Sequence, residues 1–172
     1  MAILGLLKDR EMHGYELKKE LTAQLGQFWQ ASYGSLYPTV RRLERRGLIE
    51  LAYPKVDVTR RRNIYRITEE GEKFFEQRLC ERAAVLDDTK FGVRFAFSRY
   101  LTVDDRVDLL ERRRAYLLEM VADLREKLKS YREKIDKYTY RLMEHRVDTT
   151  RADIEWIDRL IAEEKPKTKP NG

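Results

Sequence analysis

The chain has 172 residues, and its hydrophobic fraction of 42% is enough for a core and excludes wholesale disorder. Charged residues make up 38%, above the roughly 25% of an ordinary globular domain, so we expect long helices with solvated faces. The formal net charge of +6 is compatible with an anionic partner. The single cysteine, Cys80, excludes an intrachain disulfide.

The N-terminal segment argues against a targeting signal. It becomes charged after an apolar run over 2–7 and lacks the apolar length and the small-residue cleavage site of a signal peptide. No window approaches the ~20 apolar residues that a membrane span needs. We therefore expect a cytoplasmic protein without a membrane segment.

Two helices are predicted in the first 25 residues. The apolar run 2–7 forms the first. The second, over 14–25, is amphipathic, with apolar side chains recurring at helical spacing, and Gly26 is well placed to end it. His13, directly before it, is expected to be a helix-entry residue.

A third helix is predicted from Ser35 to Gly47. Ser35 can cap it, and Pro38 falls within its first turn, where a missing N–H costs little. One face of this helix should be buried, because apolar residues recur at i, i+4 and i+7: Leu36, Val40 and Leu43.

A hairpin and a fourth helix come next. Residues 48–53 and 61–67 have the composition of short strands, with 54–59 as the intervening loop. Thr68 begins a helix that is predicted to run to about Lys90, with Gly71 as a mild cost. Three helices followed by a β-hairpin within about seventy residues are typical of a winged helix-turn-helix domain.

The second half predicts a long helix. Residues 91–103 are apolar and aromatic, and Thr102 and Asp104 can cap a helix that starts after them. From there, apolar side chains recur on alternating three- and four-residue steps, which predicts continuous helix over about 104–147, roughly 65 Å long at 1.5 Å per residue. A break at 147–150 and a last helix to about Glu164 complete the prediction.

This apolar seam cannot be buried by one helix alone. It needs the last helix, a partner chain or both, and we expect a homodimer; the alternative is an intramolecular hairpin in a monomer. The expected dimerisation residues lie along both helices: Leu117, Val121, Leu124, Leu128, Tyr131, Ile135, Tyr138, Leu142, Ile154, Ile157, Leu160 and Ile161.

The predicted fold is therefore mainly α and modular. A winged helix-turn-helix domain over 1–75 is followed by a connecting helical segment over 76–103. A coiled-coil-like dimerisation domain of long helices covers 104–164, and the polar tail 165–172 is expected to be disordered.

Basic charge gathers in one stretch of the chain. Between Tyr33 and Arg66, nine basic residues stand against three acidic ones, an excess equal to the formal charge of the whole chain. The stretch covers the third helix and the hairpin, the two elements that a winged helix lays against DNA. Double-stranded DNA is therefore the expected partner.

The geometry of a helix assigns roles to these residues. An α-helix fits the major groove and meets base edges near its N-terminus. The face opposite the apolar one presents the expected DNA-contacting residues: Ser35, Tyr37, Pro38, Thr39, Arg41, Arg42 and Arg45. The hairpin would add contacts to a minor groove or to flanking phosphates, from Lys55, Arg60, Arg61 and Arg62.

Simpler interpretations stay open for some of these residues. An arginine run can be a solvated helix face, Arg46 can favour the helix C-terminus, and Tyr37 can be core packing. Three aromatic residues, Trp29, Phe95 and Trp156, can line a pocket for a planar small-molecule effector or pack as core.

Other classes of protein fit less well. His13 and His145 lie far apart, and the sequence contains no nucleophilic triad, glycine-rich phosphate loop or metal-ligand spacing, so we expect no enzyme, cofactor or metal. The assignment as a purely structural coiled-coil protein would not explain the basic charge of the third helix and the hairpin. A winged-helix regulator of the MarR type would also bind DNA, and would differ from this prediction in how its dimer is built.

Three segments resemble the PadR family of bacterial transcriptional regulators: HGYELKKEL, YGSLYPTVRRLERRGLIE and RRNIYRITEEG, within roughly 2–75. From KFGVRFAFSRYL to ADIEWIDRLI the chain is similar to the family's helical C-terminal domain. The resemblance implies a homodimer with interlocking C-terminal helices, usually a repressor at a palindromic operator and in some relatives released by a small molecule. It maps the groove-contacting helix onto 35–46 and the wing onto 54–62. The sequence departs from the family at its start, where the helix that often precedes AILGLL is short or absent.

Overall fold

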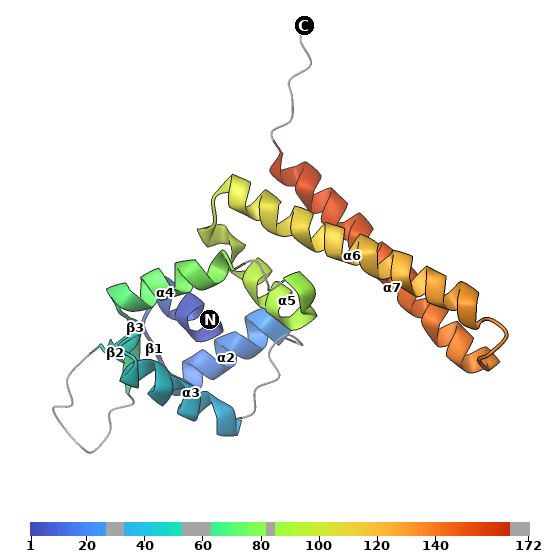
Figure 1. Ribbon diagram of the computed structural model, residues 1–172. Helices are drawn as coiled ribbons and strands as arrows, with labels where there is room; N and C mark the ends of the chain where they lie inside the picture. The colour runs from blue at the N-terminus through green and yellow to red at the C-terminus, as the bar shows by residue number, and fades with distance from the viewer. Residues whose placement is uncertain (27–32, 53–62, 82–84, 166–172) are drawn as a thin grey trace, which may run out of the picture. The chain divides into compact units, whose positions relative to one another are not determined.

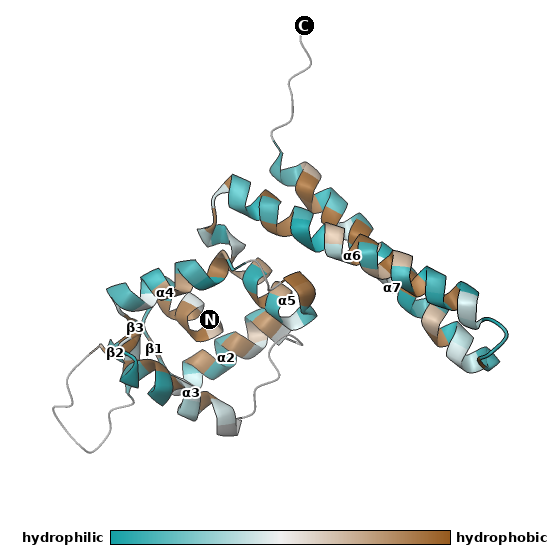
Figure 2. Cartoon of the chain, in the orientation of Figure 1, coloured by the Kyte–Doolittle hydropathy of each residue, from teal (hydrophilic) through white to brown (hydrophobic). Residues whose placement is uncertain are grey.

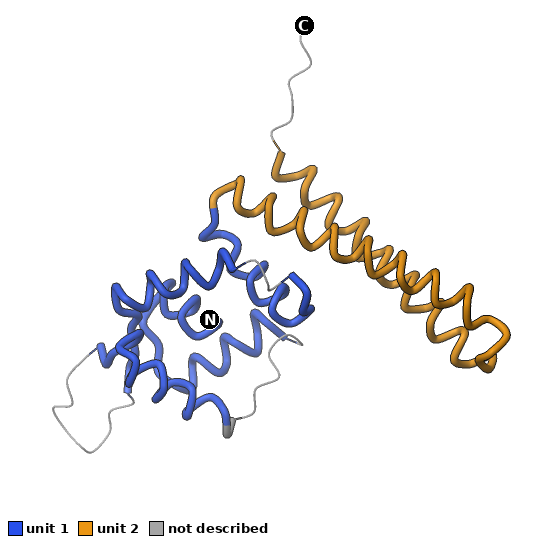
Figure 3. Tube along the Cα trace, in the orientation of Figure 1, with its two compact units in different colours: residues 1–101 blue, residues 102–172 orange. Residues whose placement is uncertain are grey.

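The computed structural model describes residues 1–26, 33–52, 63–81 and 85–165, and of Tyr33 and Gly34 the backbone alone. The chain forms two compact units, Met1–Leu101 and Thr102–Gly172 (Figure 3). Within the described residues, no helix has the length and apolar character needed to cross a membrane.

The first unit is a winged helix-turn-helix domain extended by a further helical segment (Figure 1). Its helices before the wing and the paired strands confirm the predicted mainly α fold. Its elements are α1 (Ala2–Asp9), β1 (Met12–His13), α2 (Gly14–Leu25), α3 (Tyr33–Arg45), β2 (Ile49–Leu51), β3 (Ile64–Ile67), α4 (Glu69–Leu79), α5 (Asp88–Ala96) and the 3-10 turn η3 (Ser98–Tyr100).

The predicted hairpin is present as β2 and β3, which pair antiparallel with Glu50 opposite Arg66. A third strand, β1, pairs with the other edge of β3, so the sheet order is β1-β3-β2. The sequence did not predict β1, because a strand of two residues is too short to show an alternating pattern. It places His13 opposite Ile64 and ties the start of α2 to the wing.

The core of the first unit forms where α1, α2, α4 and α5 meet. Its largest fully buried side chains include Leu6, Leu17 and Phe75. Phe75 and Phe97 meet edge to face, with ring centroids 5.9 Å apart. This arrangement is favourable for aromatic rings and adds to the burial of their area.

His13 begins α2, as predicted. Its Nδ1 accepts a hydrogen bond from the Glu16 amide at 3.2 Å, and the Glu16 carboxylate accepts one from the His13 amide at 3.0 Å. This capping box satisfies two amides that the helix leaves without partners. The bond from the His13 amide is the main cause that lowers the pKa of Glu16.

Gly47 ends α3 in the left-handed conformation, with φ of 68°. The amide of Gly47 donates to the Glu44 carbonyl at 2.9 Å, and that of Leu48 donates to the Leu43 carbonyl at 3.0 Å. These two bonds form a Schellman motif, for which glycine is favoured because it carries no Cβ. The chain therefore leaves α3 in a defined direction, toward β2.

Two predicted helix boundaries are wrong. The third helix begins at Tyr33, so Ser35 is not its cap and Pro38 lies inside the helix, beyond its first turn. The fourth ends at Leu79 rather than near Lys90. A new helix, α5, begins after Asp87, whose carboxylate caps it by accepting from the Lys90 amide at 2.8 Å.

The second unit is an antiparallel hairpin of two long helices, α6 (Val103–Tyr131) and α7 (Lys137–Glu164) (Figure 1). The predicted continuous helix over 104–147 is therefore wrong, as is the break at 147–150, where Val147 and Thr150 are buried within α7. The chain turns at 132–136 because Asp136 caps α7, accepting from the amides of Tyr138 at 2.8 Å and Thr139 at 3.1 Å.

One half of this hairpin is packed within the chain. Next to the first unit in sequence, α6 buries Leu110 and Leu117, and α7 buries Ile157 and Ile161. Ion pairs between the helices flank this core. Arg106 binds Glu164 through two hydrogen bonds of 2.8 Å, Lys165 lies 3.1 Å from Glu111, and Arg114 binds Asp158.

The other half of the hairpin, toward the turn, leaves apolar side chains exposed. Tyr131 is 48% exposed, Tyr138 83% and Leu142 69%. Hydrophobic residues are interspersed with hydrophilic ones along both helices, and the ends next to the turn are mainly hydrophilic or intermediate (Figure 2). We call these three side chains the distal apolar stripe.

Gly71 is required by a close approach of two segments, rather than being the mild cost that its place in a helix suggested. A Cβ added there would lie far inside contact distance of the Leu48 carbonyl oxygen and 2.8 Å from Ile67 Cγ1. The same carbonyl accepts a hydrogen bond from the Thr68 amide at 3.2 Å, so it cannot move away freely.

We therefore expect Gly71→Ala to lower the free energy of unfolding by about 1–3 kcal/mol, the usual cost of overpacking. Chemical denaturation of the full chain measures this. Gln77→Ala, at an exposed position of the same helix, is the control and should stay close to the wild type. Equal stability of the two variants would show that α4 does not approach Leu48 as described.

Candidate nucleic-acid interface

The candidate interface is built on α3, because this helix buries one face and exposes the other. Leu36, Val40 and Leu43 are 2%, 1% and 7% exposed, as their spacing predicted. The opposite face carries most of the predicted DNA-contacting residues. Ser35, Tyr37, Pro38, Arg41, Arg42 and Arg45 are exposed, and Thr39 is half-buried.

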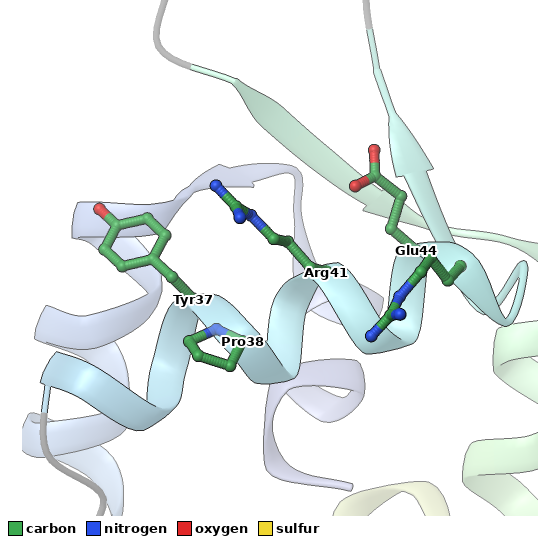
Figure 4. A pocket seen from close by; sticks show the side chains of 5 residues that line it. Tyr37, Pro38, Arg41 and Glu44 are labelled. Carbon is green, nitrogen blue, oxygen red and sulfur yellow. The ribbon is translucent and has the colours of Figure 1, made fainter.

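An open hollow of about 680 Å³ lies along this exposed side and is lined by Tyr37, Pro38, Arg41, Glu44 and Arg45. Tyr37, Arg41 and Glu44 project from one side of the helix (Figure 4). Tyr37 is 48% exposed, which argues against core packing as its main role. A polar helix face of this kind can meet the edges of bases in a major groove.

Three arginines of α3 are available for a ligand. No carboxylate in the described part of the chain pairs with Arg41, Arg42 or Arg45, and Arg42 donates only to the Thr39 hydroxyl, at 3.4 Å. We call this trio, together with Tyr37, the basic face of α3. The hydroxyl of Thr39 itself is engaged within the helix, donating to the Ser35 carbonyl at 2.8 Å.

Two other arginines of the basic stretch have structural partners. Arg46 lies over the ring of Phe74, 4.7 Å from its centroid, and joins the end of α3 to α4. Arg66 binds Glu50 at 2.8 Å across the β2–β3 ladder. The count of basic residues in the sequence therefore overstates the positive charge that is free on the described surface.

Tyr37 is held by a glycine of the neighbouring helix. A Cβ added at Gly14 would lie 2.9 Å from Tyr37 Cε1 and 3.2 Å from its hydroxyl oxygen. Gly14 is therefore the residue that lets the tyrosine ring lie against the start of α2. This explains why glycine comes directly after His13, which the sequence pattern did not show.

A second hollow, of about 370 Å³, adjoins the first and shares Tyr37 and Arg41 with it. Besides Gly14, it adds four residues from β1, α2 and β3 with the residue before it, none of which sequence reasoning assigned to the interface: His13, Tyr15, Asn63 and Tyr65. Two of them belong to the HGYE segment, whose polar and aromatic composition is the signal that could have indicated them.

Other predicted site residues are only partly described. Lys55, Arg60, Arg61 and Arg62 of the predicted wing, and Trp29 of the predicted effector pocket, lie outside the described residues. Phe95 is half-buried in the first unit, where it stacks on Phe91, and Trp156, in the second, is 38% exposed. The effector pocket stays a prediction.

The predicted dimerisation residues fall into two groups. Leu117, Val121, Ile154, Ile157 and Ile161 are buried inside the hairpin of one chain. Tyr131, Tyr138 and Leu142 are exposed in the distal apolar stripe, and the remaining four are half-buried: Leu124, Leu128, Ile135 and Leu160.

Two family models match successive parts of the chain, and the second begins within the first unit, at α5. The model of the family described as "Transcriptional regulator PadR-like family" matches residues 3–77, which contain α2, α3 and the sheet and nearly all of α1 and α4. The model described as "Virulence activator alpha C-term" matches residues 89–164. The chain belongs to the PadR-like family of transcriptional regulators.

Individual PadR-like relatives match over nearly the whole length. The "Negative transcriptional regulator PadR" of Bacillus subtilis is 24% identical over 172 residues, covering 94% of each chain. Among solved structures, the PadR-like regulator BC1756 from Bacillus cereus is 26% identical with a TM-score of 0.43 and covers 94% of both chains. Bacillus subtilis PadR in complex with operator DNA is 21% identical with a TM-score of 0.43, covering 95% of this chain and 97% of that one.

The contact between Gly14 and Tyr37 can be tested by a double-mutant cycle. We expect Gly14→Ala to displace the tyrosine ring and weaken binding to a selected DNA duplex by roughly 1–3 kcal/mol, the range for a base contact. In a Tyr37→Ala background the same change should cost little, because the ring that it displaces is gone. Fluorescence anisotropy measures both; equal costs in the two backgrounds would mean that the residues act independently.

Proposed function

We propose that this protein is a sequence-specific DNA-binding repressor that acts as a homodimer. The observation that carries the proposal is the division of α3: three apolar side chains are buried, and the basic face, with three arginines that no described carboxylate neutralises, is open to solvent. The burial fixes how the helix is presented, and the exposed charge favours a polyanion.

The residues of α3 divide into two roles along its length. Ser35, Tyr37 and Pro38 lie toward the N-terminal end, where a groove-bound helix meets base edges. Arg42 and Arg45 lie further along, where contacts to phosphates set position and salt-dependent affinity. Lys55 and the arginines over 60–62 are proposed to extend the phosphate contacts.

Repression and an effector are proposed by analogy with one relative. Bacillus subtilis PadR is described as a negative transcriptional regulator, and it has been solved both with operator DNA and with p-coumaric acid. We propose that this chain likewise represses, and that a planar small molecule modulates it. A ligand screen by thermal shift tests this part on its own.

The dimer is supported by the distal apolar stripe. Tyr138 and Leu142 lie four residues apart on one face of α7, and Tyr131 is the last residue of α6. Burial of a large apolar side chain contributes about 1.5–3 kcal/mol. Solvent-exposed apolar groups that share a stripe are typical of a protein–protein contact. A second copy of the chain is the proposed partner, and two-fold symmetry would give two copies of the basic face of α3.

The phosphate contacts can be tested by salt dependence. Replacing Arg42 and Arg45 with alanine should flatten the plot of log affinity against log salt concentration by up to about 0.9 for each lost phosphate contact. The control removes the same charge elsewhere, at two exposed arginines of the second unit, Arg125 and Arg132. If both double variants change the slope equally, α3 does not carry the contact.

The proposed dimer interface can be tested by sedimentation equilibrium. We expect the wild type at twice the chain mass of 20.7 kDa, and a Tyr138→Glu/Leu142→Glu variant at the chain mass with unchanged helix content by circular dichroism. Lys137→Glu/Arg141→Glu places two carboxylates at exposed polar positions of the same turns and should stay dimeric. Persistence of the dimer in the first variant would move the interface elsewhere.

A further inference from the structure

The second hollow, between the start of α2, the basic face of α3 and strand β3, has a composition suited to an anion. It is lined by His13, Tyr15, Tyr37, Arg41, Asn63 and Tyr65, together with Gly14. No carboxylate is among these lining residues, although acidic side chains make up a large share of the chain. We call it the α2–α3 pocket.

Several hydrogen-bond donors of the pocket are available. Tyr65 is 6% exposed, and its hydroxyl receives a hydrogen bond from Asn63 Nδ2 at 3.5 Å, while its own proton has no acceptor among the described residues. Because Tyr65 lines an open hollow, the proton of this hydroxyl can be donated to a ligand that enters the hollow. The Arg41 guanidinium and the hydroxyl of Tyr15, which is 59% exposed, are the other donors without a described partner.

One acidic side chain beside the pocket, Glu16, is compensated. Glu16 lies 3.5 Å from His13 Nε2, but it is engaged by the capping bond from the His13 amide and lies 3.6 Å from Arg10. Among the described lining residues, Arg41 is the permanently charged side chain, and the positive end of the 12-residue helix α2 adds to its charge.

These observations favour a phosphate of the DNA backbone over other anions. A phosphodiester carries a single charge on oxygens that accept several hydrogen bonds, and tyrosine, asparagine and arginine side chains are typical partners of such groups. The pocket shares Tyr37 and Arg41 with the basic face of α3, so a duplex lying on that face would pass over it. A binding site for a free anion would not need to share residues with the basic face of α3.

We infer that the α2–α3 pocket binds one backbone phosphate of the duplex and sets how deeply α3 enters the groove. This rests on the proposed function. Tyr65 and Tyr15 donate to the phosphate oxygens, Arg41 supplies the charge, and Gly14 keeps the pocket open by leaving room for the Tyr37 ring.

The experiment combines protein variants with single neutral phosphates in the DNA. The full chain first selects its preferred duplex from random sequence. Duplexes with one methylphosphonate at each position in turn are then bound to the wild type, to Tyr65→Phe and to Tyr15→Phe. Tyr140→Phe, in the second unit and outside both proposed surfaces, is the matched control. Tyr15→Phe also guards against a folding defect, because Tyr15 is exposed.

We expect Tyr65→Phe and Tyr15→Phe to bind the natural duplex about tenfold more weakly, the usual loss for a hydrogen bond to a charged group. At one position in each half-site, the methylphosphonate replaces the phosphate that the pocket contacts. The duplex with that replacement should bind to these variants and to the wild type with equal affinity. The selected sequence should not change, because backbone contacts do not read bases.

Three outcomes would overturn the inference without touching the proposed function. The first is a loss of DNA affinity in Tyr65→Phe and Tyr15→Phe no larger than that in Tyr140→Phe. The second is a difference in affinity between these variants and the wild type that persists at every methylphosphonate position. The third is tight binding of inorganic phosphate to the protein alone at matched ionic strength. Failure of the wild type to select any duplex would instead overturn the proposed function, so the two failures are distinguishable.

Discussion

The burial of Leu36, Val40 and Leu43 under α3 is the constraint on which the proposed interface depends. A helix that turns these side chains inward must present Arg41, Arg42 and Arg45 outward, whatever charge repulsion results. The junction after α3 fixes the direction of that face: the Gly47 turn leads directly into β2, Thr68 donates to the Gly47 carbonyl at 2.6 Å, and Gly71 lets α4 approach the Leu48 carbonyl. The end of α3, the start of β2 and α4 are thus held together at Gly47, Leu48 and Gly71.

The second unit also has two parts, one that buries its apolar side chains and one that exposes them. Near the start of α6 the hairpin closes on itself, with buried leucine and isoleucine side chains and the Arg106–Glu164 pair. Toward the turn it leaves the distal apolar stripe uncovered. The first half can keep the hairpin together in one chain, which leaves the second half free for association. In the proposed dimer, one part of the apolar seam of the sequence therefore closes the hairpin and the other part joins the two copies.

Much of the first unit could be predicted from local patterns. The spacing of the apolar residues of α3 gave its buried face, Gly47 its end and His13 the start of α2, because each of these signals acts within a few residues. The long helix was wrong because Ile135 and Tyr138 continue the apolar spacing across the turn, which hid the cap formed by Asp136. The partners of Arg46 and Arg66 and the contact of Gly14 with Tyr37 depend on segments far apart in the sequence, and no local pattern could indicate them. Of the α2–α3 pocket, only the HGYE segment carried a local signal.

Selection from a pool of random duplexes by the full chain tests the central claim most directly. If two copies of the basic face of α3 are held by one dimer, sequencing of the retained DNA should give an inverted repeat whose half-site centres lie one helical turn, about 34–36 Å, or a multiple of it apart. Retained DNA with no common sequence, or with a single asymmetric motif, would contradict the account.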